Sequence, residues 1–372
     1  MEIRTIDQGR HHKRELLIDD QVASWLWVID YQMYIGAAQV RMAGIGGVKT
    51  RKAYRKKGYM RALFDDTVRY MIERGDDVSM LFGIPNFYTK FGYAVCLPVY
   101  RQVVQTRDAE AAGQLSCHTT TGLQTADMGA VCDLYNAHNA GRTCALHRFP
   151  QDFTRFAKGT RWGHPAEAMA IKDPAGKLLA YAAFDRDERA VNVVEVAAVD
   201  DRLFPTLLYA FAGQAIARRC GEITLYHPPD HPFAEFVQRF GCRWEVDCRR
   251  FGGGMMRILN LGTLFERVQP ELARRSEASP LRGEADLSIV TGLGAVTLHV
   301  ARGRVEVGPM GRTPEPLAIE LSQDKLIQLM VGYRRARDVL NEDGVKVTGN
   351  ILPWLDMLFP RGHPYVWLAD HF

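Results

Sequence analysis

The residues best suited to chemistry in this chain form a short basic turn, YRKKGYMR, at 54–61. Its single glycine, Gly58, stands just before a stripe of apolar residues that predicts an amphipathic helix ended by Gly75. The free N–H groups at a helix N-terminus bind anions, and nearby cationic side chains add charge. We therefore predict that this turn holds a pyrophosphate. The residues of the predicted cradle are Lys56, Lys57, Gly58, Tyr59, Met60 and Arg61.

The segment before the turn predicts the strands that position it. The turn lacks the Lys-Ser/Thr pair that binds a nucleoside triphosphate with magnesium. Residues 34–50 predict two strands, the second ending at 48–50. The GIGG sequence within them fails as a dinucleotide fingerprint, because Lys49 stands where a third glycine is needed. These glycines instead predict that another backbone or a ligand comes close to the strand.

A strand and a short aromatic segment follow the helix. VSMLFG at 78–83 predicts the strand, and Pro85 is expected to start a short helix. Phe87 and Phe91 are spaced to share one face of that helix. Tyr88 lies off this pair and is therefore free to face a ligand.

The strand, the Arg55-x-x-Gly58 turn, the helix and the FYTKFGY segment together resemble the GNAT acetyltransferase superfamily. More narrowly, AGIGGV, YRKKGYMRALF and NFYTKFGY resemble the Eis (enhanced intracellular survival) family, which tolerates Met60 at the last small position of the loop. The resemblance implies acetyl-CoA as the acetyl donor, with its pyrophosphate on 56–61. The cofactor contacts that it implies elsewhere are Val48, Lys49, Thr50, Gly83 and Ile84.

Residues 195–228 repeat the order of strand, turn, helix and strand, but without the chemistry. When the two helices are aligned, Asp201 and Phe204 take the places of the arginine and the glycine of the loop. Pro205 removes one of the amides that the cradle needs. Further along, Val237 stands where the tyrosine would be. We expect this copy to keep the fold without the catalysis.

The last third of the chain has a mixed pattern. A helix at 261–275, several strands and two later helices are similar to the sterol-carrier-protein-like domain that ends Eis-family chains. The GGG sequence at 252–254, just before it, predicts a bulge or turn. The final stretch is rich in aromatic residues, so we expect it to be buried together with the α-carboxylate of Phe372.

Acetyl transfer to an amine needs a base for the ammonium proton and an acid for the departing thiolate. A tyrosine, with a pKa of about 10, can protonate a thiolate whose conjugate acid has a pKa of about 8.5, so Tyr88 is the candidate acid. The first part of the chain offers no convincing Glu or His as the base. The resemblance assigns that role to the C-terminal carboxylate, here that of Phe372. The alternative is that Phe372 is only a hydrophobic plug.

The composition limits the other classes of function. A chain of 372 residues predicts two or three domains. The formal net charge of +4 is too small to indicate a nucleic-acid partner. The absence of a long apolar run or a signal peptide predicts a cytoplasmic protein without membrane contact. The seven cysteines have no metal-ligand spacing, so we expect them to be reduced and expect no metal. The basic segment at 10–14 is expected to be a solvated helix or turn.

These features predict an α+β enzyme of three domains. They are a catalytic GNAT acetyltransferase domain (1–104), a degenerate second GNAT-like domain (105–260) and a sterol-carrier-protein-like domain (261–372). The enzyme would transfer acetyl directly from acetyl-CoA to an amine. The resemblance implies a small polyamine-like or aminoglycoside-like acceptor and a homo-oligomer such as a hexamer.

Two alternatives stay open. The protein could bind CoA or an apolar ligand without catalysis, or it could transfer a longer acyl chain. Only residues 8–21 separate the first two predicted strands, where family members usually carry two helices. We therefore expect the acceptor pocket to differ from that of the family.

Overall fold

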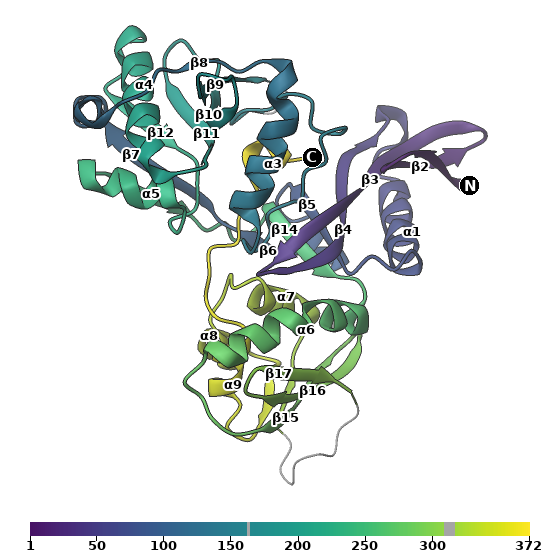
Figure 1. The fold of residues 1–372 in the computed structure, drawn as a ribbon. Coiled ribbons are helices and arrows are strands. Elements are labelled where there is room, and N and C mark those ends of the chain that lie inside the picture. The colour runs from purple at the N-terminus through teal and green to yellow at the C-terminus, as the bar shows by residue number, and fades with distance from the viewer. Residues whose placement is uncertain (162–163, 309–316) are drawn as a thin grey trace.

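The structure, a computed structural model, describes residues 1–161, 164–308 and 317–372. Figure 1 shows three lobes. Each lobe is built on its own sheet. The chain end returns from the third lobe to lie between the other two.

The first lobe has a seven-stranded sheet in the order β1-β2-β3-β4-β5-β14-β6. Its strands are β1 (Glu2–Gln8), β2 (His11–Ile18), β3 (Gln21–Ile35), β4 (Ala38–Thr50), β5 (Val78–Gly83), β6 (Ala94–Leu97) and β14 (Gly253–Ile258). Helix α1 (Tyr59–Glu73) covers one face and buries Leu63 and Phe64. Gly58 before it and Gly75 after it both have left-handed φ, and Gly75 ends the helix as the sequence predicted.

Most of the basic segment at 10–14 lies in β2, and only Arg10 lies in the turn before it, so the prediction of a solvated helix or turn is wrong for residues 11–14. Strands β1, β2 and β3 form an antiparallel meander. Alternation along β2 sends Arg14 to the covered face, where it pairs with Asp66 of α1. A cluster of basic residues can therefore include a buried member, because an acidic partner on a neighbouring helix pairs with its charge.

The second lobe repeats the topology of the first. β10 pairs antiparallel with β11, β11 pairs parallel with β12, and α4 joins the parallel pair as α1 joins β4 to β5. The strands are β7 (Val99–Gln105), β8 (Thr121–Gly122), β9 (Ala166–Lys172), β10 (Leu178–Asp185), β11 (Val191–Ala198), β12 (Glu222–Leu225) and β13 (Arg243–Asp247). The helices are α2 (Thr106–Glu110), α3 (Met128–Asn139), α4 (Phe204–Ala217) and α5 (Pro232–Val237).

The two lobes exchange one strand each, at equivalent positions. β14 lies between β5 and β6 of the first sheet, and β7 lies between β12 and β13 of the second. The glycines at 252–254 form the expected bulge at the start of β14: Gly252 and Gly253 have left-handed φ, and the register with β6 shifts between Gly254 and Met255. Gly254 allows close packing there, because a Cβ on it would lie 2.6 Å from the side chain of Leu97. The predicted domain boundary at 104–105 falls within β7, which lies between β12 and β13 in the second sheet.

The third lobe packs against the face of the first sheet opposite to α1. A shared core joins Met42 and Val78 of that sheet to Leu264 and Phe265 of α6. The strands are β15 (Ala285–Thr291), β16 (Gly294–Ala301), β17 (Arg304–Val307), β18 (Leu317–Glu320) and β19 (Lys346–Thr348), and the helices are α6 (Leu261–Ala278), α7 (Gln323–Met330), α8 (Ala336–Leu340) and α9 (Leu352–Leu358). Among the described residues, no helix has the length and apolar character needed to cross a membrane.

Candidate active site

The basic turn presents backbone amides at the start of α1. Gly58 caps the helix with a φ of 80°, and Lys56 has a φ of 63°. The first helical bond joins the N–H of Ala62 to the carbonyl of Gly58 at 3.1 Å, so the amides of 59–61 precede it and are available to a ligand. The first turn of α1 holds no acidic residue, and a Cβ on Gly58 would meet no atom within 4 Å. The turn therefore fits a pyrophosphate.

An opening between β4 and β5 begins next to this turn. Their parallel pairing ends at Ile45 and Leu81, although β4 continues to Thr50. Residues 48–50 thus lie on one side of the opening. The end of β5 forms the other side, where the side chain of Ile84 is 65% exposed. An extended ligand arm can lie along the free edge of β4 here.

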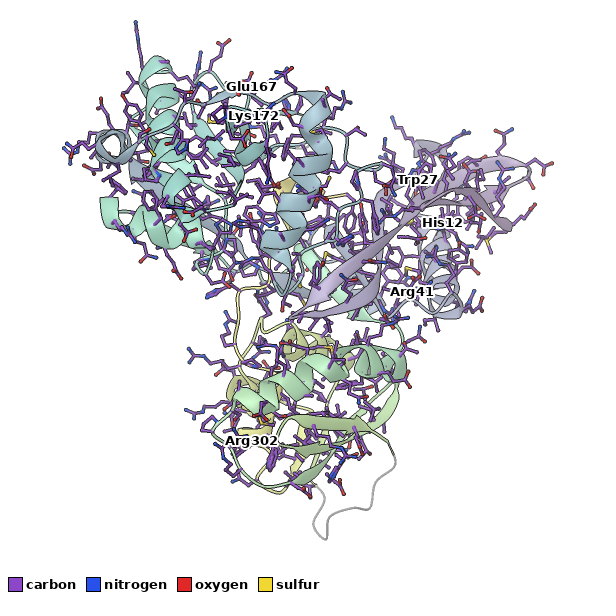
Figure 2. The ribbon with its side chains drawn as sticks, viewed as in Figure 1. His12, Trp27, Arg41, Glu167, Lys172 and Arg302 are labelled. Atoms are coloured by element: carbon purple, nitrogen blue, oxygen red, sulfur yellow. The ribbon has the colours of Figure 1, made fainter. Side chains whose placement is uncertain are left out.

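A bulge in β4 shapes the opening. The register between β3 and β4 shifts between Trp25 and Trp27, and Gly47 has a left-handed φ of 59°. A Cβ on Gly47 would lie 2.8 Å from the indole ring of Trp27, which is labelled on the first lobe in Figure 2. The bulge bends β4 and frees its last residues from the regular ladder.

Tyr88 lies beside the end of β5. The prediction of a short helix starting at Pro85 is wrong. Asn86 has a left-handed φ of 62°, which interrupts a helix, so the segment contains only one 3₁₀ turn, Tyr88–Phe91. The ring of Tyr88 rests on Gly83, where a Cβ would come within 2.5 Å of it. Burial raises the pKa of Tyr88 above its ordinary value, so the hydroxyl keeps its proton at neutral pH.

The last residue, Phe372, is buried against the face of β4 opposite to α1. Ile45 faces α1, so its neighbours Gly44 and Gly46 face the chain end. A Cβ on Gly46 would lie 3.2 Å from the carboxyl carbon of Phe372, and one on Gly44 would lie 2.8 Å from its ring. That ring stacks on Tyr31 with centroids 5.0 Å apart. The close approach predicted from the GIGG sequence is therefore that of the chain's own end.

His371, which no sequence motif singled out, also lies at this site. Its ring stacks on Phe82 with centroids 3.7 Å apart, and the ammonium group of Lys158 donates to its carbonyl. Burial, aided by the charge of Lys158, lowers the pKa of His371 to about 3, so the imidazole is neutral at pH 7. Its position depends on contacts with both lobes, which no local pattern reveals.

Two cavities flank the chain end. The larger, of about 390 Å³, is lined in part by Phe82, Gly83 and His371. The smaller, of about 110 Å³, is lined in part by Ile29 and Tyr31. Within the described part of the chain, no group of His, Cys, Asp and Glu side chains could hold a metal ion. The arrangement offers an anion cradle, a buried phenol and a chain end around one opening.

This arrangement has a counterpart among known families. Residues 9–96 match the acetyltransferase (GNAT) domain family. The first lobe contains a GNAT acetyltransferase domain. The matched range includes the basic turn, the opening and Tyr88. The chain is therefore an acyltransferase with an acyl-CoA donor. No curated protein matches the sequence.

Solved structures share the fold along nearly the whole chain. A probable N-acyltransferase from Enterococcus faecalis has 17% identity and a TM-score of 0.76, covering 98% of this chain and 90% of that one. A GCN5-related N-acetyltransferase from Kribbella flavida has 20% identity and a TM-score of 0.72, covering 98% and 88%. Eis1 from Mycobacterium abscessus has 14% identity and a TM-score of 0.66, covering 99% and 91%. These likenesses confirm the predicted α+β fold with two tandem GNAT folds.

Proposed function

We propose that the chain is an N-acetyltransferase that moves acetyl from acetyl-CoA directly to a primary amine of a small molecule. Tyr88 is the general acid, and the terminal carboxylate of Phe372 is the general base. The turn at 56–61 holds the pyrophosphate, and the two sides of the opening between β4 and β5 hold the pantetheine arm. The family resemblance favours a polyamine-like or aminoglycoside-like acceptor.

The chemistry needs one proton removed and one supplied. Acetyl-CoA provides an activated acetyl thioester. The carboxylate of Phe372 takes a proton from the acceptor's ammonium group, so that the nitrogen lone pair can attack the thioester carbonyl. The C–N bond forms as the C–S bond breaks, and the Tyr88 hydroxyl protonates the departing sulfur. The nitrogen then gives up its second proton, which returns through water to the Tyr88 phenolate, and the carboxylate releases the first proton to solvent.

The observation that carries this proposal is the position of the two groups on opposite faces of one opening. Tyr88 belongs to the core on the α1 side and contacts Gly83. Phe372 belongs to the core on the other side and contacts Gly46. The donor therefore enters from the side of the basic turn, and the acceptor from the side of the chain end.

The acceptor side supports a small molecule. The cavity of about 390 Å³ beside His371 is within the usual range for small-ligand pockets. Residues 2–35 form three strands joined by tight turns, so the wall here is a sheet where family members usually carry helices. We therefore propose no individual amine.

The proposal extends to the rest of the chain. The second lobe lacks a donor site of its own, because α4 starts with Pro205 near its N-terminus and follows Asp201. The third lobe is a sterol-carrier-protein-like domain, and the protein is a homo-oligomer, for instance a hexamer. All seven cysteines are free, which supports a cytoplasmic location.

Extension of the chain past Phe372 tests the assignment of the base. A few added residues convert the carboxylate into an amide and should abolish turnover of an amine panel, measured as CoA thiol released, while acetyl-CoA still binds. Phe372→Ala keeps a terminal carboxylate and should be milder. Wild-type turnover in the extended protein would mean that Phe372 is a plug. Acetyl-CoA binding without turnover of any amine by the wild type would favour a non-catalytic binding protein.

A further inference from the structure

A fully buried ion network lies in the second lobe, close to the end of the chain. The guanidinium of Arg148 donates two hydrogen bonds of 2.6 Å to the carboxylate of Glu195 on β11. It donates two more, of 2.7 and 3.0 Å, to the carboxylate of Asp370. The side chains of Arg148, Glu195 and Asp370 are 2%, 1% and 6% exposed. Charges this deeply buried are tolerated in a folded protein only when each is paired and its hydrogen-bonding groups are satisfied.

Tyrosine hydroxyls and aromatic rings complete the network. Tyr135 donates to Asp370 at 2.8 Å, and Tyr181 donates to Glu195 at 2.7 Å. The guanidinium lies 3.6 Å from the ring centroid of Tyr135. Bidentate pairing fixes the plane of the guanidinium, so the position of Asp370 is defined in both distance and direction.

Asp370 belongs to the segment that carries the proposed base. Only His371 separates it from Phe372, and each residue spans at most about 3.5 Å of chain. Other second-lobe residues hold the same segment: Asn139 accepts a 2.7 Å bond from the indole of Trp367. Lys158 donates to the carbonyl of His371. The second lobe thus holds the backbone that leads to the carboxylate.

The contacts that Phe372 makes with the first lobe are of a different kind. Its ring lies against Tyr31 and Phe82, with centroids 5.0 and 5.5 Å away. Ring contacts limit how far the side chain moves, but they do not direct a carboxylate. A general base must stay within hydrogen-bond reach of the proton that it removes. The directional restraint comes from the second lobe, through the ion network at Asp370 and the bond from Lys158 to the carbonyl of His371.

We propose that Arg148, backed by Glu195, is a positioning residue that clamps Asp370 and so holds the terminal carboxylate beside Gly46. The inference rests on the proposed function, because it assigns a role to the base named there. It gives the second lobe a part in the reaction at the first lobe's site.

The test compares two buried carboxylates, each paired with arginine. Asp370→Asn keeps the shape but weakens the clamp. Glu271→Gln makes the same change in the third lobe, where Glu271 pairs with Arg274 and Arg275. We expect Asp370→Asn to lower kcat at least about tenfold, the scale expected of a sub-ångström misplacement, with unchanged acetyl-CoA affinity. Glu271→Gln should lower thermal stability without this loss of kcat.

A second measurement separates a misplaced base from a general loss of structure. An acceptor that the wild type turns over is compared with its β,β,β-trifluorinated analogue, whose amine is already neutral at the assay pH and so needs no base before it attacks the thioester. The kcat deficit of Asp370→Asn should shrink for the fluorinated amine. An equal deficit with both amines, or no deficit at all, would overturn the clamp. If Asp370→Asn fails to fold, Tyr135→Phe serves in its place, because it removes only a hydroxyl bond to Asp370.

The chain extension separates this inference from the proposed function. If extension past Phe372 leaves turnover intact, the base assignment fails and the clamp fails with it. If extension abolishes turnover while Asp370→Asn and Tyr135→Phe keep the wild-type kcat, only the clamp is wrong. Loss of turnover in all three, with acetyl-CoA still bound, supports both.

Discussion

Gly46→Ala tests the base by moving it rather than removing it. The new Cβ would lie 3.2 Å from the carboxyl carbon of Phe372. Carbon atoms in contact prefer about 3.5–4.0 Å, so the carboxyl group must shift by roughly 0.3–0.8 Å. The φ of Gly46 is not left-handed, so alanine adds no backbone strain there.

The expected loss follows from that shift. A displacement of about 1 Å in a catalytic group costs roughly 10²-fold in rate, so half of it should cost about tenfold, or about 1.4 kcal/mol of barrier. The donor should be unaffected, because the basic turn and Tyr88 lie on the other face of β4. We expect kcat to fall about tenfold while acetyl-CoA affinity, measured by calorimetry, stays unchanged.

Two other glycines provide the controls. Gly44→Ala would push on the ring of Phe372, at 2.8 Å, and should destabilise the fold more than Gly46→Ala does. Gly213→Ala in α4 meets no atom within 4 Å and should leave kcat unchanged. A crystal structure of the Gly46→Ala protein with a displaced carboxylate, together with a wild-type kcat, would refute the assignment of the base.

The remaining predictions concern the cradle, the acid and the buried histidines. Gly58→Asp should weaken acetyl-CoA binding at least about tenfold by calorimetry, whereas Gly58→Asn, with the same shape and no charge, should weaken it less; equal losses would mean that charge is not the cause. Tyr88→Phe should lower turnover about 10²–10⁴-fold with donor affinity kept, and near-normal turnover would exclude Tyr88 as the acid. Burial lowers the pKa values of His227 and His371 to about 3. Below about pH 6.5 the unfolded chain therefore binds more protons than the folded chain, and the stability of the fold decreases as the pH is lowered. Each histidine should cost about 2 kcal/mol at pH 5, and His371→Phe should remove its share of that slope in urea unfolding; an unchanged slope would contradict the linkage.

Local signals in the sequence were sufficient for the core of the first lobe. The limits of α1 follow from Gly58, Gly75 and the apolar stripe between them, because left-handed glycines and helical periodicity act over a few residues. The buried aromatic end at Phe372 follows from composition alone. These features need no knowledge of what lies across the sheet.

Features that depend on distant partners were not predictable. The strand exchange is one, because β14 and β5 are far apart in sequence and no pattern within residues 253–258 indicates which strands β14 pairs with. The ion network is another, since Arg148 and Asp370 are separated by 222 positions. Asp201, Pro205 and Val237 predicted a second copy without catalysis of its own, but they gave no sign that this copy holds the end of the chain.

The strand exchange has a consequence for a chain that is still being made. When the first 105 residues have left the ribosome, β5 and β6 both lack the neighbour that separates them, and β7 has no sheet to join. Their open edges could pair with other chains until β14 follows, so we expect this interval to be the period of greatest risk of aggregation. The first sheet can be completed only after residue 258, the end of β14, has been made. If the proposed base is correct, a nascent chain can hold its donor well before it can use it, and acetyl transfer starts only when residue 372 is in place.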